Sequence, residues 1–143
     1  MGSYIPDHSA GKMLAVAGPS GLTTDPGDTD DHAIEGLSVV LPRAGTYAFN
    51  FTLFGQLSAD PTVVGFGVKF SGTTQLLSAV CAYLPQSDPE TLPTLELAGT
   101  SPFVNNANGV ITVAGPGTLS VQFNRDTNTI SWLAGGGGWV IEK

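Results

Sequence analysis

Charged residues and cysteine are both scarce in this sequence. Charged residues make up 12% of the 143 residues, about half of the roughly 25% found in typical soluble proteins. Acidic residues outnumber basic ones by 12 to 5, which gives a net charge of −7. Such a surface repels a phosphate backbone, so we expect no direct nucleic-acid binding. The one cysteine, Cys81, can form no disulfide within the chain, and its apolar segment predicts a buried thiol without a redox role.

Long apolar runs are also missing. The longest runs, such as residues 76–82, are far shorter than the roughly 20 residues that a membrane-spanning helix needs. We therefore expect a soluble chain with no membrane partner. The first residues lack the basic start and apolar stretch of a secretory signal. Together with the initial methionine, this favours a protein that is made in a cytoplasm.

Helical segments are not expected either, because helix breakers are abundant. The chain contains 19 glycines and 10 prolines, together a fifth of its residues. That composition does not suit a helical bundle, and no segment has the spacing of an amphipathic helix. The fold class that remains is all-β.

Residues that could perform catalysis are nearly absent from the predicted strands. Both histidines, His8 and His32, lie near the N-terminus. The chain has no serine-hydrolase, zinc-protease, P-loop or paired-cysteine motif. We therefore predict no enzyme activity and no cofactor. A metal-assisted hydrolase that uses His8 or His32 with nearby acids is the least favoured alternative.

The N-terminal quarter differs in composition from the rest of the chain. Six of the 12 acids lie in the first 35 residues. Residues 18–31 hold one bulky apolar residue among many turn formers, which is typical of a loop, whereas residues 13–17 favour one short strand. We predict an acidic, extended arm over residues 1–32, followed by a single domain over residues 33–143. The arm's expected anchors to a partner are Ile5, Met13, Leu14 and Val16.

Four aspartates lie within seven residues of the arm, at positions 25, 28, 30 and 31. Calcium sites draw oxygen ligands from short flexible loops of this kind. The spacing is not that of an EF-hand, and a solvated acidic loop is the favoured interpretation. If a cation binds, Asp28 and Asp30 are the first ligands to test.

From residue 33 onward, apolar and polar residues alternate with a period of two, which indicates half-buried strands. Segments with turn composition separate them, among them residues 85–89 and residues 105–109, Asn-Asn-Ala-Asn-Gly. About eight strands at such spacing predict an antiparallel sandwich, barrel or jelly roll. The expected strands cover residues 37–41, 46–53, 63–70, 76–84, 92–98, 110–113, 119–123, 129–133 and 139–142.

Four consecutive glycines, residues 135–138, lie between Trp132 and Trp139. We expect them to join the last two strands, because glycine permits turns that other residues cannot make. The two tryptophans could form a carbohydrate platform, but a place in the core or in an interface is favoured for strand residues of this size.

The heptapeptide at residues 45–51, Gly-Thr-Tyr-Ala-Phe-Asn-Phe, is the most specific motif. It resembles the central signature of the complement-type, tumour-necrosis-factor-like jelly roll, and the resemblance extends over roughly residues 34–143. Val39 stands where that signature has a phenylalanine. The resemblance implies a compact homotrimer. Jelly rolls of this kind are also similar to those on bacteriophage virion surfaces. The aromatic side chains share one strand face, which must be covered by an opposing sheet. The expected core signature is Gly45, Tyr47, Phe49 and Phe51.

These observations predict an antiparallel jelly-roll sandwich with an extended N-terminal arm, assembled as a closed homotrimer. Val40, Phe54 and Val63 lie on the second faces of their strands, and association of subunits would bury them. The predicted function is a capsid decoration (minor capsid) protein at the virion surface, which is assembled in the host cytoplasm and has the major capsid protein as its partner. The alternative is a recognition module, either a phage tail receptor binder or a carbohydrate-binding domain. Its candidate aromatic residues are Tyr4, Tyr83, Phe103 and Trp139.

Overall fold

The computed structural model describes residues 13–19, 27–59 and 62–143. Within these residues the chain forms strands and turns and no helix. The described residues therefore contain no helix that is long and apolar enough to span a membrane. The strands are β1 (Met13–Ala17), β2 (His32–Leu41), β3 (Gly45–Leu57), β4 (Thr62–Phe70), β5 (Thr74–Cys81), β6 (Leu84–Gln86), β7 (Thr94–Leu97), β8 (Phe103–Val113), β9 (Gly117–Arg125), β10 (Ile130–Trp132) and β11 (Gly137–Glu142).

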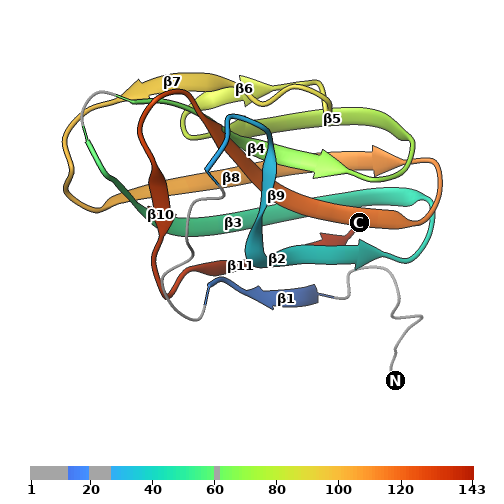
Figure 1. Ribbon diagram of the computed structural model, residues 1–143. Coiled ribbons are helices and arrows are strands. Elements are labelled where there is room, and N and C mark those ends of the chain that lie inside the picture. Colours follow the sequence, from blue (N-terminus) through green and yellow to red (C-terminus); the bar gives the residue numbers. More distant parts are fainter. Residues whose placement is uncertain (1–12, 20–26, 60–61) are drawn as a thin grey trace.

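The strands form two antiparallel sheets that pack face to face (Figure 1). Sheet A has the order β1-β11-β3-β8-β5-β6, and β10 also pairs with β3. Sheet B has the order β2-β9-β4-β7. Neighbours in both sheets are mostly distant in sequence, as in sandwiches whose chain crosses between layers. The predicted all-β, antiparallel fold class is confirmed.

The core lies between the two sheets and contains the predicted aromatic strand. Tyr47, Phe49 and Phe51 on β3 are all buried, and the hydroxyl of Tyr47 donates a hydrogen bond to the carbonyl of Arg43 at 2.7 Å. The ring of Trp132, also fully buried, packs edge-on against Phe123 of sheet B, with 5.5 Å between ring centroids. Large inward side chains of the two sheets therefore meet in one apolar layer.

Cys81 ends β5 and is fully buried, as the sequence predicts. Burial raises the pKa of its thiol to about 12. The thiol is therefore protonated and unreactive at neutral pH.

The prediction of a turn at residues 105–109 is wrong, because this segment lies inside β8. Its inward-facing small residues stand beside large aromatic residues of β3: Ala107 pairs with Phe51 and Gly109 with Phe49. A Cβ atom on Gly109 would lie 2.3 Å from the carbonyl oxygen of Ser78 on the other side. The small residues that suggested a turn instead leave room for the rings and for a close neighbouring strand.

The segment 76–84, predicted as one strand, is divided by a two-residue turn. Cys81 at the end of β5 pairs with Leu84 at the start of β6, and Ala82 and Tyr83 form the turn between them. Both turn residues have positive φ, 51° and 69°. Because neither is a glycine, their sequence gives no sign of this conformation.

Part of the predicted arm is an edge strand of sheet A. Residues 13–17 form the predicted short strand, which pairs with β11 of the same chain (Figure 1). Val16 is half-buried against the core of its own chain. Ile5 and the side chains of Met13 and Leu14 lie outside the described residues, so anchoring by these three stays a prediction.

The glycine run joins β10 to β11, as expected. Gly135 and Gly136 have φ values of 95° and 74° in this connection, and Gly137 and Gly138 begin β11. A Cβ atom on Gly138 would lie 2.0 Å from the carbonyl oxygen of Asn50. The run therefore allows both the turn and a close approach of β11 to β3.

Candidate functional site

The outer face of sheet A carries no charged residue on its described strands. Inward residues of these strands are buried in alternation, so the intervening residues face away from sheet B. The outward residues are Thr46, Ala48, Asn50, Thr52, Phe54 and Gln56 on β3, Leu76, Ser78 and Val80 on β5, Val104, Asn106, Asn108, Val110 and Thr112 on β8, and Trp139 and Ile141 on β11. We call this surface the uncharged face.

Exposed apolar side chains are concentrated on the uncharged face. The large apolar residues of the face that remain exposed are Phe54, Leu76, Val80, Val104 and Trp139. Val104 is 55% exposed and lies directly opposite Phe54 on the neighbouring strand. Among the described residues of sheet B, the corresponding ones are Val40 and Val63. The other exposed apolar residues of the uncharged face lie opposite polar ones: Val80 pairs with Asn108, Leu76 with Thr112 and Trp139 with Asn50. A face that mixes exposed apolar side chains with uncharged polar ones is typical of a protein interface.

A chain of asparagine side chains orders the centre of the uncharged face. The amide nitrogen of Asn106 donates to the side-chain oxygen of Asn50 at 2.8 Å and to the hydroxyl of Thr52 at 2.9 Å. The amide nitrogen of Asn108 donates in turn to the side-chain oxygen of Asn106 at 2.6 Å. These side chains are held before any partner binds, which lowers the entropic cost of association.

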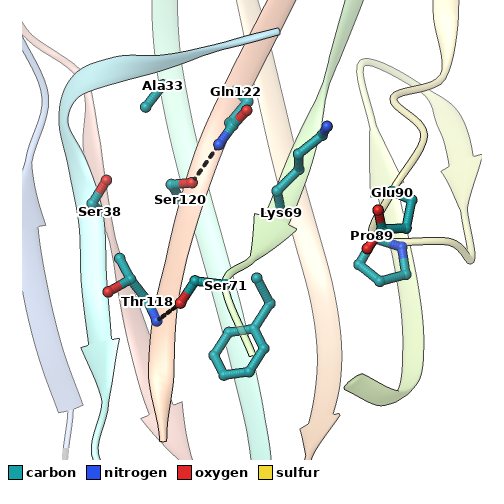
Figure 2. A pocket seen from close by; sticks show the side chains of 10 residues that line it. Ala33, Ser38, Lys69, Ser71, Pro89, Glu90, Thr118, Ser120 and Gln122 are labelled. Atoms are coloured by element: carbon teal, nitrogen blue, oxygen red, sulfur yellow. Dashed lines mark hydrogen bonds between the residues drawn. The ribbon is translucent and has the colours of Figure 1, made fainter. Parts of the chain in front are cut away.

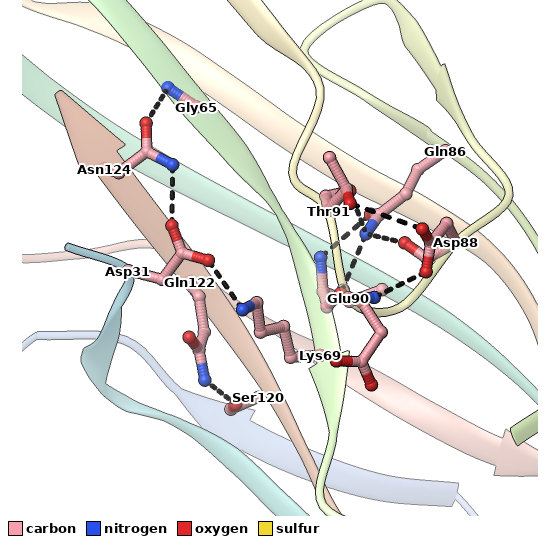
Figure 3. Close-up of polar contacts among 11 residues, drawn as sticks. Asp31, Gly65, Lys69, Gln86, Asp88, Glu90, Thr91, Ser120, Gln122 and Asn124 are labelled. Atoms are coloured by element: carbon pink, nitrogen blue, oxygen red, sulfur yellow. Dashed lines mark hydrogen bonds and ion pairs between the residues drawn. The ribbon is translucent and has the colours of Figure 1, made fainter. Parts of the chain in front are cut away.

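Sheet B differs because its outer face holds charged and hydrogen-bonded groups (Figure 3). The ammonium of Lys69 lies 2.6 Å from a carboxylate oxygen of Asp31. The amide of Asn124 donates to the other oxygen of Asp31 at 2.6 Å and accepts from the backbone N–H of Gly65 at 3.0 Å. Burial opposes ionisation of Asp31, but the bonds from Asn124 and Lys69 outweigh it and lower the pKa of the carboxyl. The network therefore ties Asp31, the residue before β2, to β9 and β4 of sheet B.

The candidate cation ligands Asp28 and Asp30 are involved in local contacts. A carboxylate oxygen of Asp28 lies 2.6 Å from Nε2 of His32 and accepts the backbone N–H of Asp30 at 2.9 Å. The hydrogen bond with His32, followed by that of Asp30, lowers the pKa of Asp28. Within the described ranges, no three His, Cys, Asp or Glu residues are grouped closely enough to hold a metal ion.

A groove of about 340 Å³ crosses the outer face of sheet B (Figure 2). β2 bulges away from β9 between Ala33 and Ser38, where the register shifts. Bulges of this kind are common beside functional sites. Hydroxyl and amide groups line the groove together with one ammonium and one carboxylate; the polar residues are Ser38, Lys69, Ser71, Glu90, Thr118, Ser120 and Gln122.

The aromatic residues proposed for ligand recognition do not come together. Tyr83 is 92% exposed at the β5–β6 turn, whereas Phe103 is half-buried against Trp132 with 6.1 Å between ring centroids. Trp139 lies on β11, and β3 and β8 separate that strand from β5. Tyr4 lies outside the described residues. The described aromatic residues therefore form no continuous carbohydrate platform.

No protein-family model and no curated protein matches the chain, but solved structures do. Eiger TNF from S. frugiperda is 11% identical over 94% of this chain and 93% of that chain, with a TM-score of 0.50. A chain in the structure of infectious bursal disease virus, Gx strain, is 10% identical over 90% of this chain, with a TM-score of 0.52. The chain has a jelly-roll fold. It spans 32% of the length of the viral chain. At such low identity the likeness concerns the fold, and it confirms the TNF-like part of the predicted resemblance; the bacteriophage part stays a prediction.

Proposed function

We propose that the protein is a structural virion protein that associates with itself through the uncharged face. The finer assignment is a homotrimeric capsid decoration protein on the outer shell, with the major capsid protein as its second partner. The uncharged face is the observation that carries this proposal. Copies with a net charge of −7 repel one another, and contact through a face without charge keeps their acids apart. Burial of its exposed apolar residues supplies the driving force.

The fold likeness supports the same proposal from a second side. One of the similar chains belongs to the structure of a virus, so a jelly roll of this kind occurs in virus structures. The hydrogen-bonded asparagine side chains of the uncharged face also support the proposal, because side chains that are already ordered suit a fixed assembly more than an adaptable binding loop. A virion location follows as part of the proposal.

A charge placed on the uncharged face is expected to separate the subunits. Val104→Asp would bury a carboxylate in the interface, which is unfavourable unless the charge is paired. Light scattering should show about 44 kDa, three times the 14.7 kDa of one chain, for the wild type and a monomer for Val104→Asp. Val40→Asp is the matched control, because Val40 is 63% exposed on sheet B; it should remain trimeric. The proposed interface lies on sheet A, so of the three residues that the sequence places in an interface it includes Phe54 and leaves Val40 and Val63 outside. A monomeric wild type at micromolar concentration would refute self-association.

Binding to a shell is expected to depend on the first 12 residues. Their removal deletes the expected anchor Ile5 but keeps β1, which pairs with β11 in sheet A. The shortened protein should remain a trimer and co-sediment less with bare capsids. High salt should further weaken binding if the exposed acids Asp30 and Glu35 meet a basic shell. Undiminished co-sedimentation would show that residues 1–12 are dispensable for shell binding, and a wild type that does not co-sediment would contradict decoration.

The groove on sheet B favours saccharide recognition as a second candidate function. Its hydroxyl and amide groups can both donate and accept hydrogen bonds, and its volume falls in the range of small-molecule sites. This candidate would gain support if the isolated protein retained a neutral saccharide while failing to bind capsids.

A further inference from the structure

The turn between β5 and β6 has an unfavourable backbone conformation. Ala82 and Tyr83, with φ values of 51° and 69°, are the only non-glycine residues with positive φ in the described part of the chain. Two-residue hairpin turns with positive φ at both positions usually contain asparagine and glycine, because a Cβ atom is disfavoured there. Strain of this kind persists only where the surrounding structure imposes it, and it is concentrated at functional sites.

Several contacts impose this conformation. The backbone N–H of Ala82 donates to the carbonyl of Asn106 at 2.9 Å, and the side chain of Ala82 is buried. On β6, the buried amide of Gln86 accepts from the backbone N–H of Val68 at 3.0 Å and donates to the carbonyl of Val68 at 2.9 Å. The hairpin is therefore fixed to β8 of its own sheet and to β4 of sheet B.

The strained turn gives its own chain no visible stabilisation through Tyr83. The side chain is 92% exposed, so its ring contributes almost nothing to the core. Beside it, Val80, Asn106 and Asn108 of the uncharged face line a hollow of about 70 Å³. That hollow is far smaller than the roughly 300 Å³ of a typical small-molecule site. Tyrosine is enriched among the anchor residues of protein interfaces, and here an exposed tyrosine stands on a turn whose backbone is fixed to β8.

We propose that Tyr83 anchors one copy of this chain on the uncharged face of the next copy. This inference rests on the proposed self-association and names Tyr83 as the residue on which that association depends. The turn lies at the β5–β6 edge of sheet A, continuous with the uncharged face through Val80 and Asn108. In a closed ring of identical copies, one surface meets a different surface of its neighbour, so an edge can dock on a face. A second copy also explains why no charge adjoins Tyr83 on this face, since each copy is strongly acidic.

Tyr83→Asn separates anchoring from folding. Asparagine tolerates the left-handed conformation, so the melting temperature of the dissociated subunit should not fall. Analytical ultracentrifugation across a dilution series should show a dissociation constant at least about 30-fold higher than that of the wild type, as expected for an anchor residue. Tyr83→Phe, which keeps the ring, should associate nearly as well as the wild type. Val40→Asn on sheet B is the control and should leave the dissociation constant unchanged.

The possible outcomes distinguish this inference from the function on which it rests. A monomeric wild type would refute both. A trimeric wild type with equally tight association of Tyr83→Asn would refute the anchor and leave self-association standing. A clear fall in the melting temperature of the dissociated Tyr83→Asn subunit would show a structural role for the ring and overturn the inference. An intact Tyr83→Asn trimer that no longer co-sediments with capsids would assign Tyr83 to the shell contact instead and overturn it as well.

Discussion

Truncation of Phe49 to alanine is expected to lower the free energy of unfolding by about 3–5 kcal/mol. The side chain is 1% exposed at the centre of β3, and its ring centroid lies 5.9 Å from that of Phe51. Its direct neighbours across the sheet are Val140 on β11 and Gly109 on β8. Gly109 has no side chain that could move into the space left by the ring, so most of the cavity would remain.

Phe54→Ala on the same strand is the matched control. Phe54 faces outward and is 37% exposed, so its truncation removes a similar volume without opening a cavity in the core. Denaturant unfolding of both variants in the Val104→Asp background, in which the proposed association is absent, measures the difference directly. Equal losses of stability for the two variants would show that the inward and outward faces of β3 are assigned wrongly.

The faces of the strands could be predicted from the sequence because side-chain alternation is a local property. The pattern at residues 45–51 places its three aromatic side chains on one face, and all three are buried. The same reasoning places Val40, Phe54 and Val63 outward, and each is at least 37% exposed. Period-two patterns specify which side of a strand is covered without specifying which strand covers it.

The uncharged face could not be predicted, since it depends on which strands are neighbours. The sequence shows that charge is scarce, but not that the outward residues of β11, β3, β8 and β5 adjoin one another. Such pairing joins segments far apart in the chain and leaves no local signal. The turn prediction for residues 105–109 was wrong for the same reason. The small residues of this segment are explained by their neighbours on β3 and β5, which the sequence does not show.

Gln86 had no sequence signal either, although it links the two sheets. It lies in a segment of turn composition, Pro-Gln-Ser-Asp-Pro, and is 3% exposed. Its amide nitrogen also donates to the backbone carbonyl of Asp88 at 3.0 Å (Figure 3). β7 pairs with β4 only as far as Gly65, so it leaves the backbone of Val68 without a strand partner on that side. The Gln86 amide bonds both the N–H and the carbonyl of Val68 and so takes the place of the missing strand. A Cβ atom on Gly67 would lie 2.5 Å from its oxygen, so the neighbouring glycine makes room for it.

Gln86→Leu is therefore expected to lower the free energy of unfolding by roughly 2–6 kcal/mol, because two buried backbone groups of Val68 would lose their partners at about 1–3 kcal/mol each. Gln122→Leu is the matched control, since that amide is half-buried on sheet B and bonds only the hydroxyl of Ser120 among described side chains. It should change stability by less than about 1 kcal/mol. Hydrogen exchange supplies a second readout: release of the β5–β6 hairpin should speed exchange of the Ala82 amide, which bonds Asn106. If Gln86→Leu were as stable as Gln122→Leu and protected Ala82 as well as the wild type, the amide link would not hold the hairpin, and the strained turn at Tyr83 would be fixed by β8 alone.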